Sequence, residues 1–234
     1  MNYKAIIFDL DGTLVDTLAD IAASMNRSLE LHGFPPVALQ EYISKVGWGI
    51  YRLALLTLPP AVRAGEGGES IAGVVAKDAT RFYAEQPLVY STLYPGILEL
   101  VAELKQRRFK TAVLTNKPDP VAHLVVDALF PPGSFNRIQG DRIGRPRKPD
   151  PRSTSELLQA LEASPEETLL VGDSEIDMET AHAVGCYAVG VSWGFRSRSV
   201  LEQSGAAHII DRPAELLGFC SGNTDEGQSG FSKD

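Results

Sequence analysis

The 234-residue chain is poor in cysteine, in long apolar runs and in basic clusters, and each shortage excludes a class of protein. Its 2 cysteines, Cys186 and Cys220, form neither a disulfide framework nor a zinc-knuckle spacing, so we expect idle thiols in a reducing compartment. No apolar stretch is long enough to cross a bilayer, and the first is too short for a secretory signal. We therefore expect no membrane partner and a cytoplasmic location.

The balance of charge narrows the range of partners further. The chain has 22 basic and 30 acidic residues, which gives a formal net charge of −8. An acidic chain without a basic run lacks the electrostatic footprint of a nucleic-acid-binding protein. The 44% apolar content is that of a globular protein, and the length allows one domain or two. Monomer and dimer both stay open.

The most informative stretch lies at the start, where an apolar run over residues 5–8 ends on Asp9, Asp11 and Gly12. Because both faces of the run are apolar, we expect a buried parallel strand with Asp9 at its carboxyl end, where open α/β sheets bind ligands. Two carboxylates this close repel each other, and a bound Mg²⁺ would hold both ionised. The alternative is a solvated Asp-Gly turn.

The rest of the chain divides into a helical stretch and an alternating stretch. We expect a helix from about Leu18 to Gly33, begun by Thr17 as a cap and Asp20 as a first-turn acid, and then helices over 39–46, 50–58 and 71–84. Beyond residue 94, helices alternate with strands at 111–114, 135–139, 169–171 and 187–191. This pattern predicts an α/β fold with a doubly wound parallel sheet, a Rossmann-like core over 1–14 and 88–219, a helical insertion over 15–87 and a mobile tail over 220–234.

Polar side chains follow the predicted strands where each one ends. Right-handed crossovers put these ends on one edge of the sheet, which would bring together Thr115 and Asn116, Lys148, and Asp173 with Asp177. Each has an ordinary explanation alone: a turn, a solvated cation or acids in the first turn of a helix. Their order after successive strands, together with the N-terminal aspartates, favours a single site.

On these residues the chain resembles the haloacid dehalogenase superfamily, in its phosphatase branch. The matching stretches are DLDGTLVD at 9–16, LTNK at 114–117, KPDP at 148–151 and GDSEID at 172–177. The helical insertion resembles the small cap of that family. Within the family, VGWG at 46–49, YPG at 94–96 and TNKP at 115–118 are most similar to phosphoglycolate phosphatases.

The resemblance implies hydrolysis of a phosphate monoester by two aspartates. Asp9 would attack phosphorus and form an aspartyl-phosphate, and Asp11 would protonate the leaving alkoxide and then activate water. Mg²⁺ would be held by Asp9, by the backbone carbonyl of Asp11 and by Asp173. Because dehalogenating and phosphonate-cleaving relatives lack an aspartate at the position of Asp11, we expect an oxygen leaving group.

The remaining motif residues would stabilise the transferring group. Thr115 and Asn116, at a helix start, would hold the phosphoryl oxygens, and Lys148 would supply a fixed positive charge. Asp177 would orient metal-bound water or Lys148, and Ser174 would add a hydrogen bond.

The insertion would select the substrate, a small phosphorylated metabolite with phosphoglycolate as the leading candidate. Gly47 and Trp48 belong to a loop that could dip into the site, and Lys45 and Arg52 could bind the substrate carboxylate. The alternative for these residues is two solvated cations and a tryptophan packed against helices.

Other functions stay open at this point. Within enzymes they are a β-phosphoglucomutase-like phosphotransferase and a pyrophosphatase. Outside enzymes they are a signalling receiver with Asp9 as phosphoacceptor, which would lack both the cap and Asp11, and an inactive binding scaffold, against which the complete acidic set argues.

Overall fold

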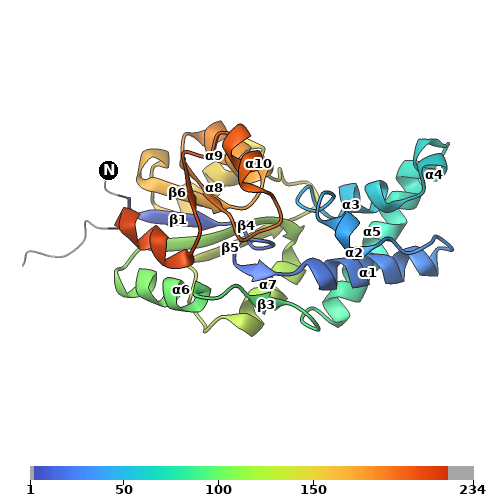
Figure 1. Cartoon of the computed structure of the whole chain (residues 1–234), viewed down its shortest axis with the longest axis horizontal. Helices are drawn as coiled ribbons and strands as arrows, with labels where there is room; N and C mark the ends of the chain where they lie inside the picture. The colour runs from blue at the N-terminus through green and yellow to red at the C-terminus, as the bar shows by residue number, and fades with distance from the viewer. Residues whose placement is uncertain (1–2, 221–234) are drawn as a thin grey trace, which may run out of the picture.

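The computed structural model describes residues 3–220, which form a parallel sheet between layers of helices and, beside it, a helical part (Figure 1). The strands are β1 (Ala5–Phe8), β2 (Val15–Asp16), β3 (Thr92–Leu93), β4 (Lys110–Pro118), β5 (Arg137–Asp141), β6 (Thr168–Gly172), β7 (Tyr187–Val191) and β8 (His208–Ile210). The helices are α1 (Leu18–Leu31), α2 (Leu39–Tyr42), α3 (Ile50–Thr57), α4 (Pro60–Ala64), α5 (Gly68–Glu85), α6 (Ile97–Gln106), α7 (Asp119–Leu129), α8 (Pro151–Leu161), η1 (Pro165–Glu167), α9 (Glu175–Val184), α10 (Arg198–Gln203) and η2 (Pro213–Cys220).

Within residues 3–220, the main sheet has six strands in the order β5-β4-β1-β6-β7-β8, and every neighbouring pair is parallel. Strand β1 lies near the middle of the sheet, between β4 and β6. The chain adds β4 and β5 on one side of β1 and then β6, β7 and β8 on the other. The predicted doubly wound α/β fold is confirmed. Asp9, the first residue after β1, therefore lies at the point where the strand order reverses, between the carboxyl ends of β4 and β6.

Both faces of β1 are buried because helices cover both sides of the sheet. Helices α8, α9 and α10 lie on one face, and α6 and α7 lie on the other (Figure 1). Ile7 packs with Leu157 and Met178 in one apolar cluster, whereas Ile6 and Phe8 belong to the other. The continuous apolar run at the start of the chain follows from this burial.

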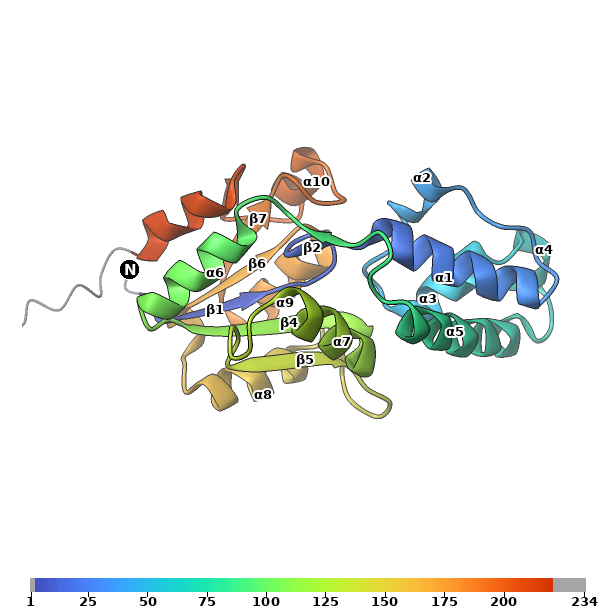
Figure 2. The same cartoon turned by 90° about the horizontal axis from the view of Figure 1, so that it is seen from below.

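Helices α1–α5 form the second part of the molecule, joined to the sheet by two crossings that pair as the short antiparallel strands β2 and β3 (Figure 2). Buried Asp20 ties the crossings together, since its carboxylate accepts hydrogen bonds from the backbone N–H groups of Tyr90 and Ser91 and from the Ser91 hydroxyl. Thr17 makes no side-chain cap bond, and its hydroxyl donates to Asp11. Asp20 is the first-turn acid of α1, as predicted, and Thr17 lies at the N-cap position, but the side chain of Thr17 bonds to Asp11 instead of capping the helix.

Short elements differ most from the sequence-based expectation. The helix expected over 39–46 ends at Tyr42, α5 begins at Gly68, and α4, β2, β3 and β8 were not predicted, because two to five residues carry too little periodicity. Cys220 ends η2 and is buried, while the rest of the predicted tail lies outside the described residues. The domain boundaries stay predictions.

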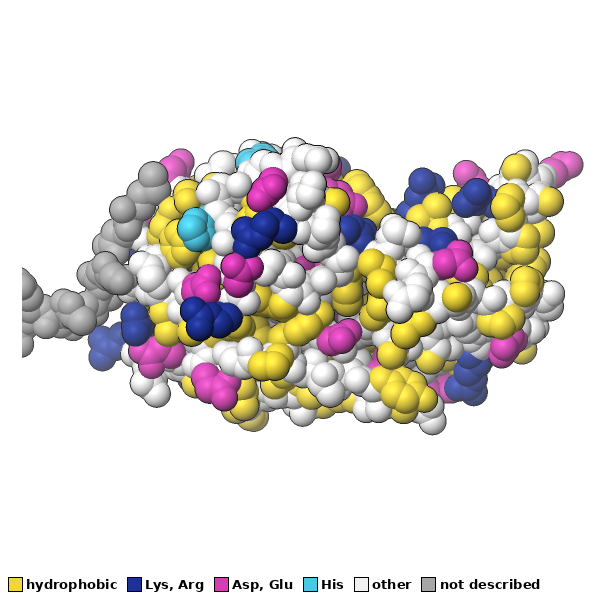
Figure 3. Space-filling model, viewed as in Figure 1, with side chains coloured by type: hydrophobic (Ala, Val, Ile, Leu, Met, Phe, Trp, Pro, Cys, Tyr) yellow, Lys and Arg dark blue, Asp and Glu magenta, His cyan; other side chains and the backbone are white. Residues whose placement is uncertain are grey.

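The outside of the molecule agrees with the composition. On the face in Figure 3, acidic and basic side chains are interspersed, and a notch in the outline marks the junction between the sheet and the helical part. Across residues 3–220, no helix combines the length and apolar character needed to span a membrane.

Candidate active site

A pocket lies at the carboxyl edge of the sheet, under the helical part. The core contributes residues that follow β1, β6 and β7 and the end of β4, and the helical part contributes the loop before α3 together with residues of α1, α3 and α5. The lining includes Asp9, Asp11, Thr115, Asn116, Asp173 and Ser174 from the core, and Val46, Gly47, Gly49, Ile50, Leu53 and Tyr83 from the helical part.

Three carboxylates converge on the core side of this pocket. Asp9, Asp173 and Asp177 each offer an oxygen within 4.8 Å of the other two. Burial, with help from the neighbouring acids, raises the pKa of Asp9 to about 7 and holds the pKa of Asp173 well above its usual range. Two donors orient Asp173: the Thr13 hydroxyl at 3.0 Å and the Phe195 backbone N–H at 2.8 Å.

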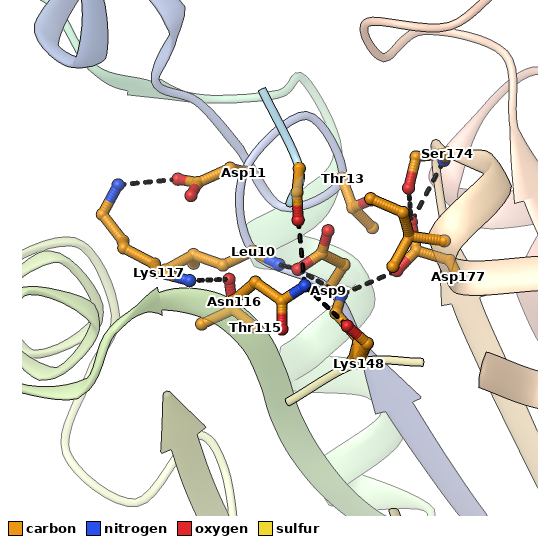
Figure 4. Close-up of polar contacts among 12 residues, drawn as sticks. Asp9, Leu10, Asp11, Thr13, Thr115, Asn116, Lys117, Lys148, Ser174 and Asp177 are labelled. Carbon is orange, nitrogen blue, oxygen red and sulfur yellow. Dashed lines mark hydrogen bonds and ion pairs between the residues drawn. The ribbon is translucent and has the colours of Figure 1, made fainter. Parts of the chain in front are cut away.

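Lys148 lies between two of these acids, as Figure 4 shows. Its ammonium nitrogen is 2.9 Å from Oδ1 of Asp9 and 2.7 Å from Oδ1 of Asp177. Burial alone would lower the pKa of Lys148, but the two carboxylates raise it, so the lysine is charged. One ammonium cannot balance three carboxylates, and the donors are hard oxygens. The cluster therefore fits a divalent cation.

Asp177 binds Lys148, one of its two expected partners, and also serves as an acid in the first turn of α9. Its Oδ1 holds Lys148, while its Oδ2 accepts from the backbone N–H of Ser174 at 3.1 Å and from the Ser174 hydroxyl at 2.6 Å. Ser174 is the N-cap of α9, and the pair forms a capping box. The start of α9 thereby fixes the direction in which Lys148 reaches Asp9.

Asp11 points away from the acid cluster (Figure 4). Its Oδ1 accepts from the Thr17 hydroxyl at 2.7 Å and from the ammonium of Lys117 at 2.9 Å. Lys117 also donates to the hydroxyl of Tyr83, on α5, at 2.8 Å. Burial opposes the charge of Lys117, yet the net direction of its pKa is upward because of Asp11. Asp9 and Asp11 thus occupy different walls of one pocket.

The sequence suggested that Thr115 and Asn116 lie at a helix start, and this prediction is wrong. Strand β4 continues through both residues to Pro118, and α7 begins at Asp119, so the helix dipole is displaced from them. The Thr115 hydroxyl accepts from the backbone N–H of Lys117 at 3.2 Å, and its own hydrogen can still be donated towards the pocket.

The side chain of Asn116 joins the core to the helical part. Its Nδ2 donates to the carbonyl oxygens of Gly47 and Lys148, both at 3.0 Å. Its buried Oδ1 has no hydrogen-bond partner within residues 3–220. Both Asn116 and Gly47 line the pocket, as predicted substrate-binding residues should, but the amide of Asn116 is engaged with backbone.

The other predicted residues of the helical part lie outside the pocket lining. Lys45 forms an ion pair with Glu41 at 3.1 Å. Trp48 is 37% exposed, and Arg52 is exposed. That these side chains bind substrate stays a prediction.

Sequence reasoning assigned no role to two cations that line the pocket, Lys117 and Arg196. Lys117 stood within a quoted motif, but its bond to Asp11 depends on the fold. Arg196 lies five residues after β7 and could have been found by the rule that located Lys148, since it too follows a parallel strand on the same edge.

Comparison with known proteins gives one consistent family. A model of the haloacid dehalogenase-like hydrolases matches residues 3–185. The phosphoglycolate phosphatase of Rhodospirillum rubrum is 35% identical over 92% of this chain and 91% of its own, and that of Mannheimia succiniciproducens is 33% identical over 92% and 97%. The crystal structure of a predicted phosphoglycolate phosphatase from Haemophilus somnus is 28% identical, covers 93% of this chain and 98% of its own, and superposes with a TM-score of 0.82.

Proposed function

Because the chain belongs to the haloacid dehalogenase-like hydrolase family, we propose that it is a Mg²⁺-dependent phosphatase acting on a small phosphorylated metabolite, with phosphoglycolate as the first candidate. The chain is a phosphoric monoester hydrolase. The observation that carries the proposal is the pairing of Asp9 with Lys148 at 2.9 Å inside a buried acid cluster, with Asp11 on another wall of the same pocket.

The bound cation would be held by carboxylate oxygens of Asp9 and Asp173, with the backbone carbonyl of Asp11 as the third predicted ligand. When bound, it would neutralise the repulsion between a phosphate dianion and the carboxylates. We name Mg²⁺ because the ligands are all hard oxygens.

The reacting groups have separate tasks. Asp9 attacks phosphorus, and the bond to the leaving oxygen breaks as an aspartyl-phosphate forms. In its protonated form, which the charge of a phosphate dianion nearby favours, Asp11 gives its proton to the leaving oxygen; the carboxylate that results then takes a proton from the water that hydrolyses the intermediate. Thr115 donates to a phosphoryl oxygen, and Lys148 offsets the charge that develops there.

Phosphoglycolate also carries a carboxylate, which needs a cation beside the leaving group. The sequence nominated Lys45 and Arg52, and we keep them as the proposed pair on the helical part. Lys117 and Arg196 lie nearer, because both line the pocket. Variants of each set separate the two possibilities through the KM for phosphoglycolate.

The test is release of phosphate from a panel of phosphorylated metabolites by the purified protein, with Mg²⁺ and with a chelator. We expect hydrolysis of phosphoglycolate that the chelator abolishes. Phosphate release that ignores the chelator would refute the proposal. The same panel would reveal a pyrophosphatase, and chromatography of its sugar phosphates would reveal a mutase, which moves phosphate between sugar hydroxyls without releasing it. Family membership argues against a signalling receiver.

A further inference from the structure

Side chains of the core bind a loop of the helical part that lines the pocket. We call this segment, residues 43–49, the docking loop. Arg196, on the loop after β7, donates to its carbonyl oxygens at Ile43 and, at 2.9 Å, Val46. Glu175, at the start of α9, orients the guanidinium with a bond of 2.9 Å to Nε. The arginine side chain is only 10% exposed, so this is a buried contact rather than a surface ion pair.

Two further core residues bind the next carbonyls of the docking loop. The carbonyl of Gly47 accepts from Asn116 at 3.0 Å, and that of Trp48 accepts a long bond of 3.5 Å from Arg147. Donors from three separate core segments therefore converge on neighbouring peptide groups. A backbone carbonyl taken out of water needs such a donor, which makes the core a template for one position of the loop.

The glycines of the docking loop show how closely it approaches the core. A Cβ at Gly47 would lie 2.9 Å from Cδ1 of Ile176, and one at Gly49 would lie 2.9 Å from Nη1 of Arg147. Both glycines also have positive φ values, 111° and 85°. Side chains at these positions would lift the loop off the sheet edge. Trp48, between them, is 37% exposed.

The position of the docking loop fixes the shape of the pocket. Val46, Gly47 and Gly49 line it opposite Asp9. The chain itself connects the helical part to the sheet only at the two crossings of β2 and β3, so contacts at the far end must set how far this part closes.

We propose that Arg196, oriented by Glu175, is a positioning residue: it anchors the docking loop over the nucleophile and so closes the pocket on a small substrate. The kinetic consequence rests on the proposed phosphatase activity. The anchoring of the docking loop does not rest on that activity, because it concerns only the contact between the loop and the core. Four of the five N–H groups of Arg196 are committed, two to Glu175 and one each to Ile43 and Val46, which argues against direct substrate binding as its main task.

The experiment compares Arg196→Met with Arg198→Met, a matched control two residues away whose exposed guanidinium pairs with Asp211. The first readout is amide hydrogen exchange. In Arg196→Met, amides of residues 43–53 should exchange about tenfold faster or more, while β1, β4 and α5 stay as in the parent protein. Arg198→Met should leave both regions unchanged. Glu175→Gln should speed loop exchange less than Arg196→Met does.

The second readout is kinetic. Phosphoglycolate has a poor leaving group that needs Asp11 and a closed, water-poor site, whereas an aryl phosphate has a good one. The ratio of kcat/KM for phosphoglycolate to that for p-nitrophenyl phosphate should fall about tenfold or more in Arg196→Met and recover partly in Arg196→Lys, which keeps one donor. The same ratio with ethyl phosphate, which has a poor leaving group but no carboxylate, should fall by a similar factor, whereas loss of a direct bond to the substrate carboxylate would leave the ethyl phosphate ratio unchanged.

The outcomes separate the two proposals. Loop exchange equal to that of the parent protein, or faster exchange throughout the sheet as well, would overturn the positioning role. A loss that is equal for both substrates would also overturn it. If the parent protein released no phosphate from any substrate, the proposed function would fail, and the exchange result would still decide whether Arg196 anchors the loop.

Discussion

The sheet edge and the docking loop fix their positions by different means. At the sheet edge, charged side chains bind one another: Lys148 bridges Asp9 and Asp177, which also caps α9. At the docking loop, core side chains bind backbone carbonyls. The chemistry therefore depends on residue identity at the sheet edge. The fit over the substrate depends on backbone geometry, which tolerates sequence change as long as the glycines remain.

The largest loss of activity should follow from a substitution at the sheet edge. Asp9→Asn removes the attacking carboxylate but keeps its shape, so phosphate release should fall at least about a thousandfold with an unchanged circular dichroism spectrum. Steady-state assays with p-nitrophenyl phosphate measure this. Activity within a few fold of the parent protein would exclude Asp9 as the nucleophile.

Asp11→Asn should have the next largest effect and should depend on the leaving group. General acid–base catalysis contributes about 10²–10⁴-fold, so hydrolysis of phosphoglycolate should fall within that range. Aryl-phosphate cleavage should suffer less in its first step, because its leaving group needs no proton. Equal losses at the first step for both substrates, measured by burst kinetics, would place Asp11 outside proton transfer.

Metal binding should link stability to pH at the sheet edge. Burial raises the pKa of Asp9 to about 7 from 3.8, so ionising it costs stability in the folded protein. Below about pH 4 this cost is absent, and it is complete above pH 7, so the metal-free protein should lose stability over that interval. Mg²⁺ at 100 times its Kd adds about 2.7 kcal/mol, or roughly 5–10 °C in Tm for a chain of this length.

Thermal melts with and without Mg²⁺ test this linkage. The metal should raise Tm clearly at pH 8 and little at pH 5, where the proton competes with it. Asp9→Asn is the matched control and should respond little at either pH. A parent protein whose Mg²⁺ response is the same at both values would break the link between Asp9 and the cation.

The smallest effect should come from the two cations of the helical part that the sequence nominated. Lys45→Met and Arg52→Met should each raise the KM for phosphoglycolate by about two- to threefold, because Lys45 is already paired with Glu41 and Arg52 is exposed, so that either charge would interact weakly with the substrate. Ethyl phosphate, which lacks the carboxylate, is the comparison substrate. A KM that rises equally for both substrates would remove these residues from carboxylate recognition.

The sequence predicted the sheet edge better than the docking loop for a physical reason. Parallel strands bring their carboxyl ends together whatever covers them, so Asp9, Lys148 and Asp173 could be placed in one site from strand order alone. The bond from Arg196 to Val46 joins residues 150 positions apart on two separately packed parts. No periodicity encodes how two such parts meet. The turn of Asp11 towards Lys117 has the same origin, since it also needs Tyr83 from the helical part.

The most direct test of the account is the intact mass of the Asp11→Asn protein after incubation with Mg²⁺ and an aryl phosphate. Without Asp11 to activate water, the intermediate should accumulate, and the protein should gain the mass of one phosphoryl group, located on Asp9 by peptide mapping. Phosphate release with no such adduct, or an adduct that persists when Asp9 is also replaced by Asn, would contradict the claim that Asp9 attacks phosphorus.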